Sequence, residues 1–368
     1  MDSDLILIIA VVAALTFDFT NGFHDTANVV ATAISTRAVP PRIAVAGAAI
    51  LNFAGAFISI EVATTIAEDL VDSNVITTTT VFAALMGAIT WNIATWYVGL
   101  PSSSSHALLG GIVGAALFAQ GFDAVKPEGV VEDIFVPAAL SPILAFLVGA
   151  GALVIAYRVA GRRQPGPISR GFKLGQLFSG GLLALAHGTN DGQKTMGVIA
   201  LALVANGTIS ADNFHVPDWV VVSAATAIAA GTYAGGWRII NTMGNRIHKM
   251  DAAQGFAAQT GGAITILAAS QYGFPLSTTH TITGAVVGSG AAKRVKAVRW
   301  GLARNIVAAW VLTLPAAGLC AGLVYWFSRL FGSGAIGPVI VSIIAAVALA
   351  LVFFRRTKKG PPVAEAST

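Results

Sequence analysis

The stretch GLPSSSSHALLGGIVG at residues 99–114 returns as GFPLSTTHTITGAVVG at residues 273–288. Gly, Pro, Ser, His, Gly, Val and Gly coincide in the two copies, at an offset of 174 residues (273 − 99). A second pair, NGFHDTANVVA at 21–31 and HGTNDGQKTMG at 187–197, aligns an Asp in both copies at an offset of 166 residues (187 − 21). Two motifs that recur in the same order at nearly the same spacing predict a duplicated structural unit.

The composition excludes a soluble globular protein. Of the 368 residues, 55% are hydrophobic and 11% are charged, whereas soluble domains carry about 25% charged residues. The mean hydropathy is +0.75, so much of the surface must face lipid. The net charge of +5 lies in short clusters between apolar segments and indicates membrane topology, with no nucleic-acid partner. The single cysteine, Cys320, excludes a disulfide within the chain and a cysteine-rich metal site.

Apolar segments recur along the whole chain, and a helix needs about 20 apolar residues to cross the hydrocarbon core. The candidate spans are 4–34, 42–60, 75–98, 105–120, 134–157, 174–206, 217–236, 252–271, 275–292, 305–327 and 336–354. We therefore expect an all-α integral membrane protein.

The basic residues predict the orientation, because cytoplasmic loops carry an excess of Lys and Arg. The basic segments are 37–42, 158–173, 238–249, 293–304 and the tail at 355–359. The loops between them are acidic or neutral, with Lys126 as the exception. We expect a multi-pass protein of the plasma (inner) membrane, in contact with lipid, with its N-terminus outside and its C-terminus in the cytoplasm.

The same charge pattern places the two halves in opposite orientations. We expect an N-terminal repeat at 1–160, a cytoplasmic linker at 161–173, a C-terminal inverted repeat at 174–330, an additional transmembrane helix at 336–354 and a cytoplasmic tail at 355–368. Inverted-topology repeats with broken helices are typical of secondary transporters, which bind substrate near the bilayer midplane. The segments 75–120 and 252–292 fit re-entrant helical hairpins, which we favour, or pairs of full crossings; the charges do not distinguish these.

A cluster of hydroxyl side chains follows each repeated Pro. Pro ends one helix and suits the first turn of the next, so the clusters should open helices at the hairpin tips. A helix N-terminus offers free N–H groups and a positive dipole end, and added hydroxyls make it an anion cradle. The anion-binding candidates are Ser103, Ser104, Ser105, Ser277, Thr278 and Thr279, with Asp25 and Asp191. The alternative is plain helix capping, which needs one hydroxyl per helix.

Polar side chains also lie inside the long spans 4–34 and 174–206, where ionisable groups are costly and are functional by default. A carboxylate beside an anion requires a bridging cation, or it accepts the proton of a hydrogen phosphate, which sulfate lacks at neutral pH. The coupling-ion or gating candidates are His24, Asn28, Asn190, Gln193, Lys194, His106 and His280. The alternatives are a structural ion pair between Asp25 and Lys194, and His side chains that only cap packed hairpins.

The segments NGFHDTANVVAT, LPSSSSH, HGTNDGQKTMG and PLSTTHTITG resemble the signature segments of the inorganic phosphate transporter (PiT) family, over about residues 10–340. The resemblance implies phosphate uptake by a symporter driven by a cation gradient, and a homodimer. By motif position it implies that the phosphate ligands are Ser104, Ser105, Thr278 and Thr279 with Asp25 and Asp191. It further implies cation-site or orienting roles for Asn28 and Asn190.

The coupling ion depends on one position. Sodium-coupled members of the family show an Asp-x-x-Asn pattern in both halves, but here the second half has Asp191 and Lys194. An ammonium group there disfavours a sodium ion by charge repulsion. This form resembles the low-affinity bacterial members, which couple to protons and take neutral complexes of phosphate with Mg²⁺ or another divalent ion. We expect proton coupling and no cofactor, with sodium coupling as the alternative.

Three other functions compete with phosphate symport. A transporter of sulfate or another oxyanion would share the cradle, and an anion channel would share the inverted broken helices. An enzyme is disfavoured, because no nucleophile and base are arranged around the His and Asp motifs.

Overall fold

The computed structural model describes residues 2–72, 75–160, 165–210 and 214–357. The elements in chain order are α1 (Asp2–Ser35), α2 (Pro41–Gly55), α3 (Glu61–Glu68), α4 (Thr78–Val98), α5 (Ser104–Gln120), η1 (Phe122–Ala124), α6 (Pro127–Gly129), η2 (Val130–Phe135), α7 (Val136–Ala160), α8 (Pro165–Ala205), α9 (Asp218–Ala234), α10 (Trp237–Asn241), η4 (Thr242–Arg246), α11 (Ala252–Gln271), α12 (Thr278–Lys293), η5 (Val295–Ala297), α13 (Trp300–Arg329) and α14 (Ile336–Thr357). Within these described ranges no strand is present, and the one β-type contact is an isolated bridge between Val71 and Val125. The expected all-α fold is confirmed.

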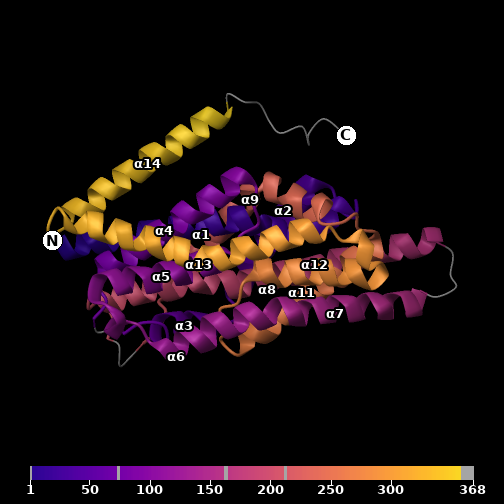
Figure 1. Ribbon diagram of the computed structural model, residues 1–368, viewed down its shortest axis with the longest axis horizontal. Helices are drawn as coiled ribbons and strands as arrows, with labels where there is room; N and C mark the ends of the chain where they lie inside the picture. Colours follow the sequence, from indigo (N-terminus) through magenta and orange to yellow (C-terminus); the bar gives the residue numbers. More distant parts are fainter. Residues whose placement is uncertain (1, 73–74, 161–164, 211–213, 358–368) are drawn as a thin grey trace.

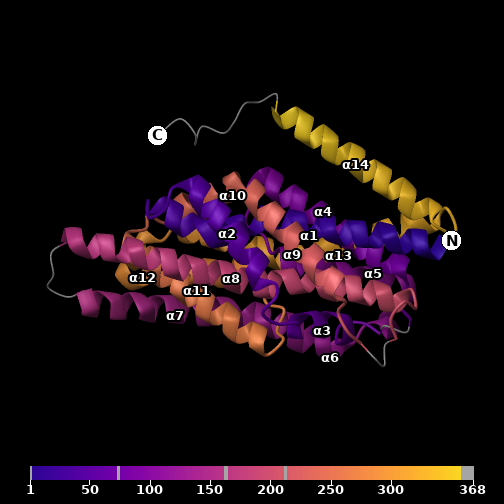
Figure 2. The ribbon, with the colours of Figure 1, turned by 180° about the vertical axis from the view of Figure 1, so that it is seen from behind.

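The long helices form an elongated bundle and run along its longest axis (Figure 1). α7 follows one edge of the bundle, and α14 stands away from it beyond its start near α13 (Figures 1 and 2). Helices of the two halves are interleaved, because α1 packs against α9 and α2 packs against α8. Neither half therefore has a core of its own.

Four described helical segments are long and apolar enough to cross a membrane: α1, α4, Pro127–Ala160 and α13. A fifth arises if α9 and Trp237–Arg246, which are bent by 61°, count as one span. Each of the expected spans contains a helix, so the positions of the helices are confirmed. However, α2, α5 and α12 have 15, 17 and 16 residues, fewer than the ~20 that a full crossing requires.

Two expectations about the long spans need correction. α1 and α8 continue as helices through their polar residues, so these two long spans are not broken helices of the kind typical of secondary transporters. α8 begins at Pro165, so most of the linker expected at 161–173 is helical; Pro is favoured in a first turn. Residues 161–164 of that linker and residues 358–368 of the expected tail lie outside the described residues, and 355–357 end α14.

The repeated Pro segments give two matching pairs of helices, α4 with α5 and α11 with α12. Each pair turns at a glycine with positive φ, +73° at Gly99 and +75° at Gly273, a conformation that other residues adopt only with strain. Each second helix then begins after a serine cap, Ser103 or Ser277. The repeated sequence motif therefore adopts the same backbone turn and the same helix cap in both halves.

Each second helix packs closely on a helix of the other half. A Cβ atom at Gly110 of α5 would lie 2.4 Å from the carbonyl oxygen of Leu314 in α13. A Cβ atom at Gly284 of α12 would lie 2.3 Å from the carbonyl oxygen of Pro142 in α7. The two glycines are 174 residues apart (284 − 110) and their partners 172 (314 − 142), so equivalent residues make equivalent contacts.

The apolar core divides into two large clusters. One contains Phe17, Ala107 and Met196, and the other contains Ala27, Ala186 and Ile282. Along α1 and α8, the polar residues lie between a member of one cluster and a member of the other. The fold therefore places a polar layer between two apolar ones.

Candidate functional site

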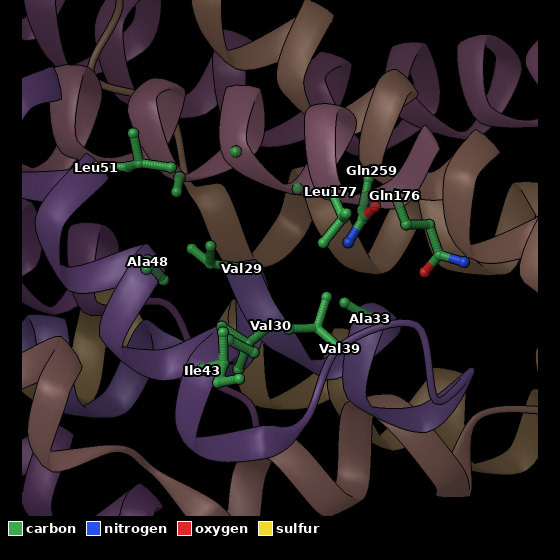
Figure 3. A pocket seen from close by; sticks show the side chains of 15 residues that line it. Val29, Val30, Ala33, Val39, Ile43, Ala48, Leu51, Gln176, Leu177 and Gln259 are labelled. Atoms are coloured by element: carbon green, nitrogen blue, oxygen red, sulfur yellow. The ribbon is translucent and has the colours of Figure 1, made fainter. Parts of the chain in front are cut away.

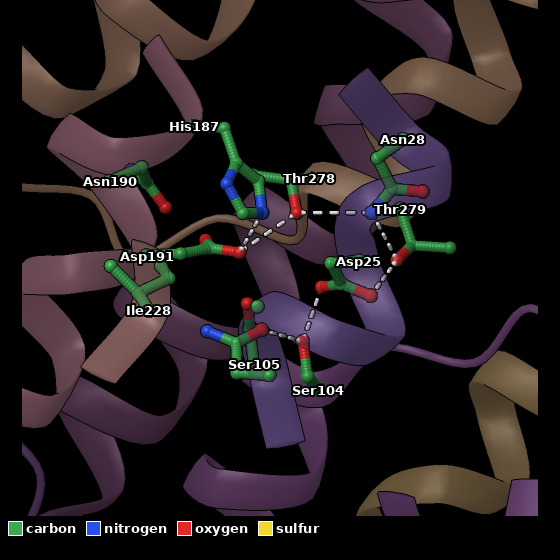
Figure 4. Close-up of polar contacts among 12 residues, drawn as sticks. Asp25, Asn28, Ser104, Ser105, His187, Asn190, Asp191, Ile228, Thr278 and Thr279 are labelled. Carbon is green, nitrogen blue, oxygen red and sulfur yellow. Dashed lines mark hydrogen bonds and ion pairs between the residues drawn. The ribbon is translucent and has the colours of Figure 1, made fainter. Parts of the chain in front are cut away.

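The polar residues of the repeated motifs meet in this layer. The middle of α1 and of α8 supply the carboxylates, and the first turns of α5 and α12 supply the hydroxyls (Figure 4). The side chains concerned are Asp25, Ser104, Ser105, Asp191, Thr278 and Thr279, each at most 2% exposed. The structure thus brings together the central residues that the sequence predicts.

Asp25 contacts the tips of both hairpins. Its carboxylate accepts a hydrogen bond from Ser104 of α5 and a longer one, 3.4 Å, from Thr279 of α12. Nδ1 of His24 lies 2.7 Å from Oδ1 of Asp25, and Nε2 of His24 faces the Thr95 hydroxyl at 3.3 Å. Asp25 is therefore placed by residues of both repeats.

Asp191 has the matching position in the second half. It accepts hydrogen bonds from Lys194 and, at 3.1 Å, from Thr278 Oγ1. Nε2 of His187 lies 3.0 Å from Oδ2 of Asp191, and Nδ1 of His187 faces the Asn52 side chain at 3.2 Å. The ammonium group makes the surroundings of Asp191 more positive than those of Asp25.

Lys194 is fully buried and connects α8 to both hairpin tips. Besides Asp191, its Nζ donates to Ser105 Oγ at 2.6 Å and to the Leu276 carbonyl at 2.8 Å. These contacts use all three donors of an ammonium group, and Asp191 balances its charge, as burial requires. The ion pair suggested by the sequence, Asp25 with Lys194, is replaced by Asp191 with Lys194.

The two predicted asparagines have different partners. Asn28 Nδ2 donates to Thr279 Oγ1 at 2.9 Å and so orients a hydroxyl of the central layer. Asn190 Nδ2 donates to Ser270 Oγ at 2.9 Å and to the Phe274 carbonyl at 3.1 Å, both at the end of α11. Asn28 is thus part of the central layer, whereas Asn190 holds the second hairpin against α8.

Three predicted residues have contacts that account for them structurally. Ser103 and Ser277 cap α5 and α12, accepting from the backbone N–H groups of His106 at 3.0 Å and His280 at 3.2 Å. The capping alternative therefore describes these two serines. Gln193 accepts from the backbone N–H of Val62 at 2.9 Å, which fixes the start of α3 against α8.

His106 and His280 lie away from the carboxylates. Their rings meet edge to face with centroids 4.4 Å apart, and His280 stacks on Trp310 at 3.9 Å. Both line an apolar pocket of about 600 Å³ between α7, α12 and α13. The two histidines therefore join the hairpins to each other behind the polar layer.

A second pocket, of about 170 Å³, lies between α1, α2 and α8 (Figure 3). Its walls are mainly aliphatic, and its polar lining is Gln176 and Gln259. Gln176 Oε1 accepts from Thr36 at 2.8 Å and Gln259 Oε1 accepts from Ser179 at 2.8 Å. The pocket contains none of the predicted site residues, and its lining does not suit an anion.

The central layer combines the groups that a tetrahedral oxyanion requires. Four hydroxyls, the free N–H groups of two helix N-termini and one ammonium group can donate to anion oxygens. Two carboxylates can accept the proton of a protonated anion. One ligand atom from each of Asp25, His187 and Asp191 lies within 4.8 Å of the others, close enough to surround a metal ion.

The sequence reasoning missed Asp18, a fully buried carboxyl on α1. It lies seven residues before Asp25, two helical turns earlier on the same face. Its presence in an apolar span was a signal of function. The repeat comparison could not reveal it, because the equivalent position in the second half is Ala184.

Comparison with known proteins agrees with this geometry. The profile of the phosphate transporter family matches residues 21–321. A "Probable low-affinity inorganic phosphate transporter" of Mycobacterium tuberculosis (strain ATCC 25618 / H37Rv) is 50% identical over 327 residues, which are 89% of this chain and 78% of the relative. Another protein so named, from Rhizobium meliloti (strain 1021), is 48% identical over 334 residues, 90% of this chain and 99% of the relative.

One solved structure, "The sodium-dependent phosphate transporter", matches with a TM-score of 0.80 and covers 88% of this chain and 99% of that chain. At 24% sequence identity this likeness shows a shared fold. The family and these relatives are transporters, which confirms the expectation of transport over catalysis. The buried polar layer, the apolar helices and the match over both halves lead to one conclusion: the chain is an integral membrane protein that belongs to the phosphate transporter family.

Proposed function

We propose that this protein is a secondary symporter that imports inorganic phosphate, driven by a proton gradient. The observation that carries the proposal is the meeting of Asp25, Asp191 and Lys194 with the hydroxyls of both hairpin tips in one buried layer. Ser104, Thr278 and Thr279 already donate to carboxylate oxygens, which have the same hydrogen-bonding character as phosphate oxygens. A bound anion would take over these donors.

Phosphate fits this layer better than sulfate does. A hydrogen phosphate ion carries a proton that Asp25 or Asp191 can accept, so a carboxylate beside it becomes an attractive partner. Sulfate carries no proton at neutral pH, so it would meet the Asp25 carboxylate as a like charge with no hydrogen bond between them. The relatives that are named as phosphate transporters support the same choice.

The position of Lys194 supports proton coupling. Its buried ammonium already neutralises Asp191, so a sodium ion at this carboxylate would meet a fixed positive charge. The solved structure that is described as sodium-dependent is of a protein with only 24% sequence identity to this chain. Sodium coupling is therefore the alternative that the experiment below must exclude.

We further propose that the halves are inverted repeats and that α4–α5 and α11–α12 are re-entrant hairpins. The equivalent contacts of Gly110 and Gly284 support the repeats, and the short α5 and α12 support the hairpins. Both tips meet the middle of long helices, as expected for a site at the midplane. We also propose, from the basic segments of the sequence, that the N-terminus lies outside and the C-terminus in the cytoplasm, and the homodimer stays a prediction from the family.

A complex of phosphate with a divalent cation is a second candidate cargo. The observation that favours it is the cluster of Asp25, His187 and Asp191, with one ligand atom each within 4.8 Å. Carboxylate and imidazole groups together suit Mn²⁺ or Zn²⁺ as well as Mg²⁺. A cation carried with phosphate would also reduce the repulsion between the anion and the two carboxylates.

The test is uptake of radiolabelled phosphate into proteoliposomes that contain the purified protein. The conditions are a proton gradient, a sodium gradient or no gradient, each with and without Mg²⁺ and with sulfate as competitor. We expect uphill uptake under the proton gradient alone, with no inhibition by sulfate. Uptake that requires sodium would overturn the proton coupling, and dissipation of a phosphate gradient without coupled accumulation would indicate a channel.

A further inference from the structure

Asp18 is a buried acid that the phosphate layer does not use. Its side chain is 0% exposed, on α1 just after Phe17, a member of the apolar core. It has none of the hydrogen bonds that place Asp25, which lies two turns further along the same helix. A free acid at this depth therefore calls for a separate function.

The surroundings of Asp18 are polar but incomplete. The Thr195 hydroxyl and the Asn21 amide lie beside the carboxyl. Yet within the part of the chain that the structure describes, neither oxygen of Asp18 nor the Thr195 hydroxyl has a hydrogen-bond partner of good geometry. The charged groups that face Asp18 are Lys194 and Asp191, both on α8. Each already has the other as its partner.

An ionised carboxylate in this position would be expensive, because burial without a paired charge costs several kcal/mol or more. A sodium ion does not remove the problem. It would need about six oxygen ligands of the kind that hard cations take, and Asn21 Oδ1 already accepts from Ser104 at 2.6 Å. It would also be repelled by the nearby Lys194 ammonium. A single proton, in contrast, neutralises the group and needs no further ligand.

We propose that Asp18 is the residue that carries the coupling proton during phosphate transport. The proposal rests on the proposed proton-coupled function and assigns the proton to a residue outside the phosphate layer. In the step proposed, a proton from the outer solution forms an O–H bond with the Asp18 carboxylate. On the inner side that bond breaks and the proton passes to water, so no other reactant is required.

The contacts also show how the proton could be coupled to phosphate. Asn21 lies beside Asp18, and its oxygen shares the single proton of the Ser104 hydroxyl with Asp25. When Asp18 is neutral, Asn21 is free to hold Ser104, and Lys194 is free to hold Asp191 and Ser105. When Asp18 is charged, its carboxylate attracts the Asn21 N–H₂ group and the Lys194 ammonium, which draws the Asn21 side chain away from Ser104 and Lys194 away from Ser105. Loss of the proton therefore loosens the tip of the first hairpin.

The experiment compares Asp18→Asn with the unaltered protein in proteoliposomes, using three measurements. These are phosphate accumulation under a proton gradient, exchange of labelled for unlabelled phosphate without a gradient, and proton entry followed by a trapped pH-sensitive dye. We expect Asp18→Asn to lose accumulation and phosphate-linked proton entry at least 10-fold, while exchange changes less than 3-fold. Asp18→Glu should restore proton entry, because it restores a titratable carboxyl.

A control variant and a check on folding in detergent distinguish the possible outcomes. Asp123→Asn removes an exposed acid in η1, outside the membrane-spanning segments, and should leave all three measurements unchanged. Uphill accumulation with normal proton entry in Asp18→Asn would overturn the proposal. Loss of exchange together with accumulation, in a variant that remains monodisperse in detergent, would also overturn it, because Asp18 would then act in substrate binding or structure. Absence of proton entry in the unaltered protein would instead overturn the proposed coupling.

Discussion

The Lys194 ammonium donates a hydrogen bond of 2.6 Å to the Ser105 hydroxyl, so α8 of the second half holds the hairpin tip of the first half. The same ammonium contacts the Leu276 carbonyl at the other tip. One buried charge thus connects both hairpins and Asp191. A substitution of this one lysine would therefore act on both hairpin tips and on Asp191 at once.

Replacement of Lys194 by Asn should lower proton-driven phosphate uptake at least 10-fold, or make uptake depend on sodium. The change leaves Asp191 buried without its cation, a situation that costs roughly 3–5 kcal/mol when one partner of a buried pair is removed. A sodium ion could then replace the lost charge. The measurement is uptake into proteoliposomes at several sodium concentrations, with Lys194→Arg as the charge-conserving control. An unchanged rate with unchanged ion dependence would contradict the assignment of Lys194.

Replacement of Asp25 or Asp191 by Asn should each abolish net phosphate uptake. An amide cannot take the proton of hydrogen phosphate, and its N–H₂ group conflicts with the donors of Ser104 or Lys194 that now face a carboxylate. Asp251→Asn, far from the polar layer, serves as the matched control. The measurement is uptake at saturating phosphate together with binding of labelled phosphate in detergent. Retained uptake in Asp25→Asn would show that this carboxylate is dispensable.

Much of the fold follows from the sequence because hydropathy and the position of Pro depend only on local residues. Each predicted span contains a helix, and the repeated motifs correctly indicate that Asp25 and Asp191 meet the hydroxyl clusters. The pairing of Lys194 with Asp191 was not predictable with the same certainty. Which carboxylate it reaches depends on the rotation and tilt of helices, and a sequence pattern does not determine these.

The positions of Ser103 and Asp18 in the site could not be predicted from the sequence pattern either. Ser103 belongs to the repeated cluster as clearly as Ser104 does, yet its hydroxyl caps α5, because the N-cap position is set by the residue at which the helix starts. Asp18 has no equivalent in the second half, so a search for repeats passes over it. Its place in an apolar span is visible in the sequence, but only the three-dimensional structure shows that, among the described residues, its oxygens have no hydrogen-bond partner of good geometry.

Substitutions of Ser104 and Ser103 by Ala should distinguish an effect on phosphate affinity from an effect on protein stability. Ser104→Ala removes a donor of the polar layer and should weaken phosphate binding about 10-fold, because a hydrogen bond to a charged group contributes roughly 1.5–3 kcal/mol. Ser103→Ala removes the cap of α5 and should lower stability by about 1 kcal/mol with little effect on affinity. Phosphate binding and thermal unfolding in detergent distinguish the two effects. The opposite pattern, with affinity lost in Ser103→Ala alone, would reverse the two assignments.

Asp251 should stabilise the end of the bundle in a manner that depends on pH. It is the N-cap of α11, and Gln254 completes a capping box with it. Burial acts to raise the pKa of Asp251, but hydrogen bonds from Lys293 and from the Gln254 backbone outweigh it and hold the pKa below its ordinary value. The stabilisation is therefore present above the unfolded-state pKa of about 3.9 and is lost as the pH falls through the lower folded-state pKa.

Asp251→Ala should lower the free energy of unfolding by about 1 kcal/mol at pH 7, and this difference should shrink below about pH 4. Unfolding temperatures in detergent between pH 7 and pH 3 measure it, with Lys293→Ala as the control that removes only the cation. A difference between the Asp251 variant and the unaltered protein that does not vary with pH would show that the carboxylate charge contributes nothing, and that the cap acts through its geometry alone.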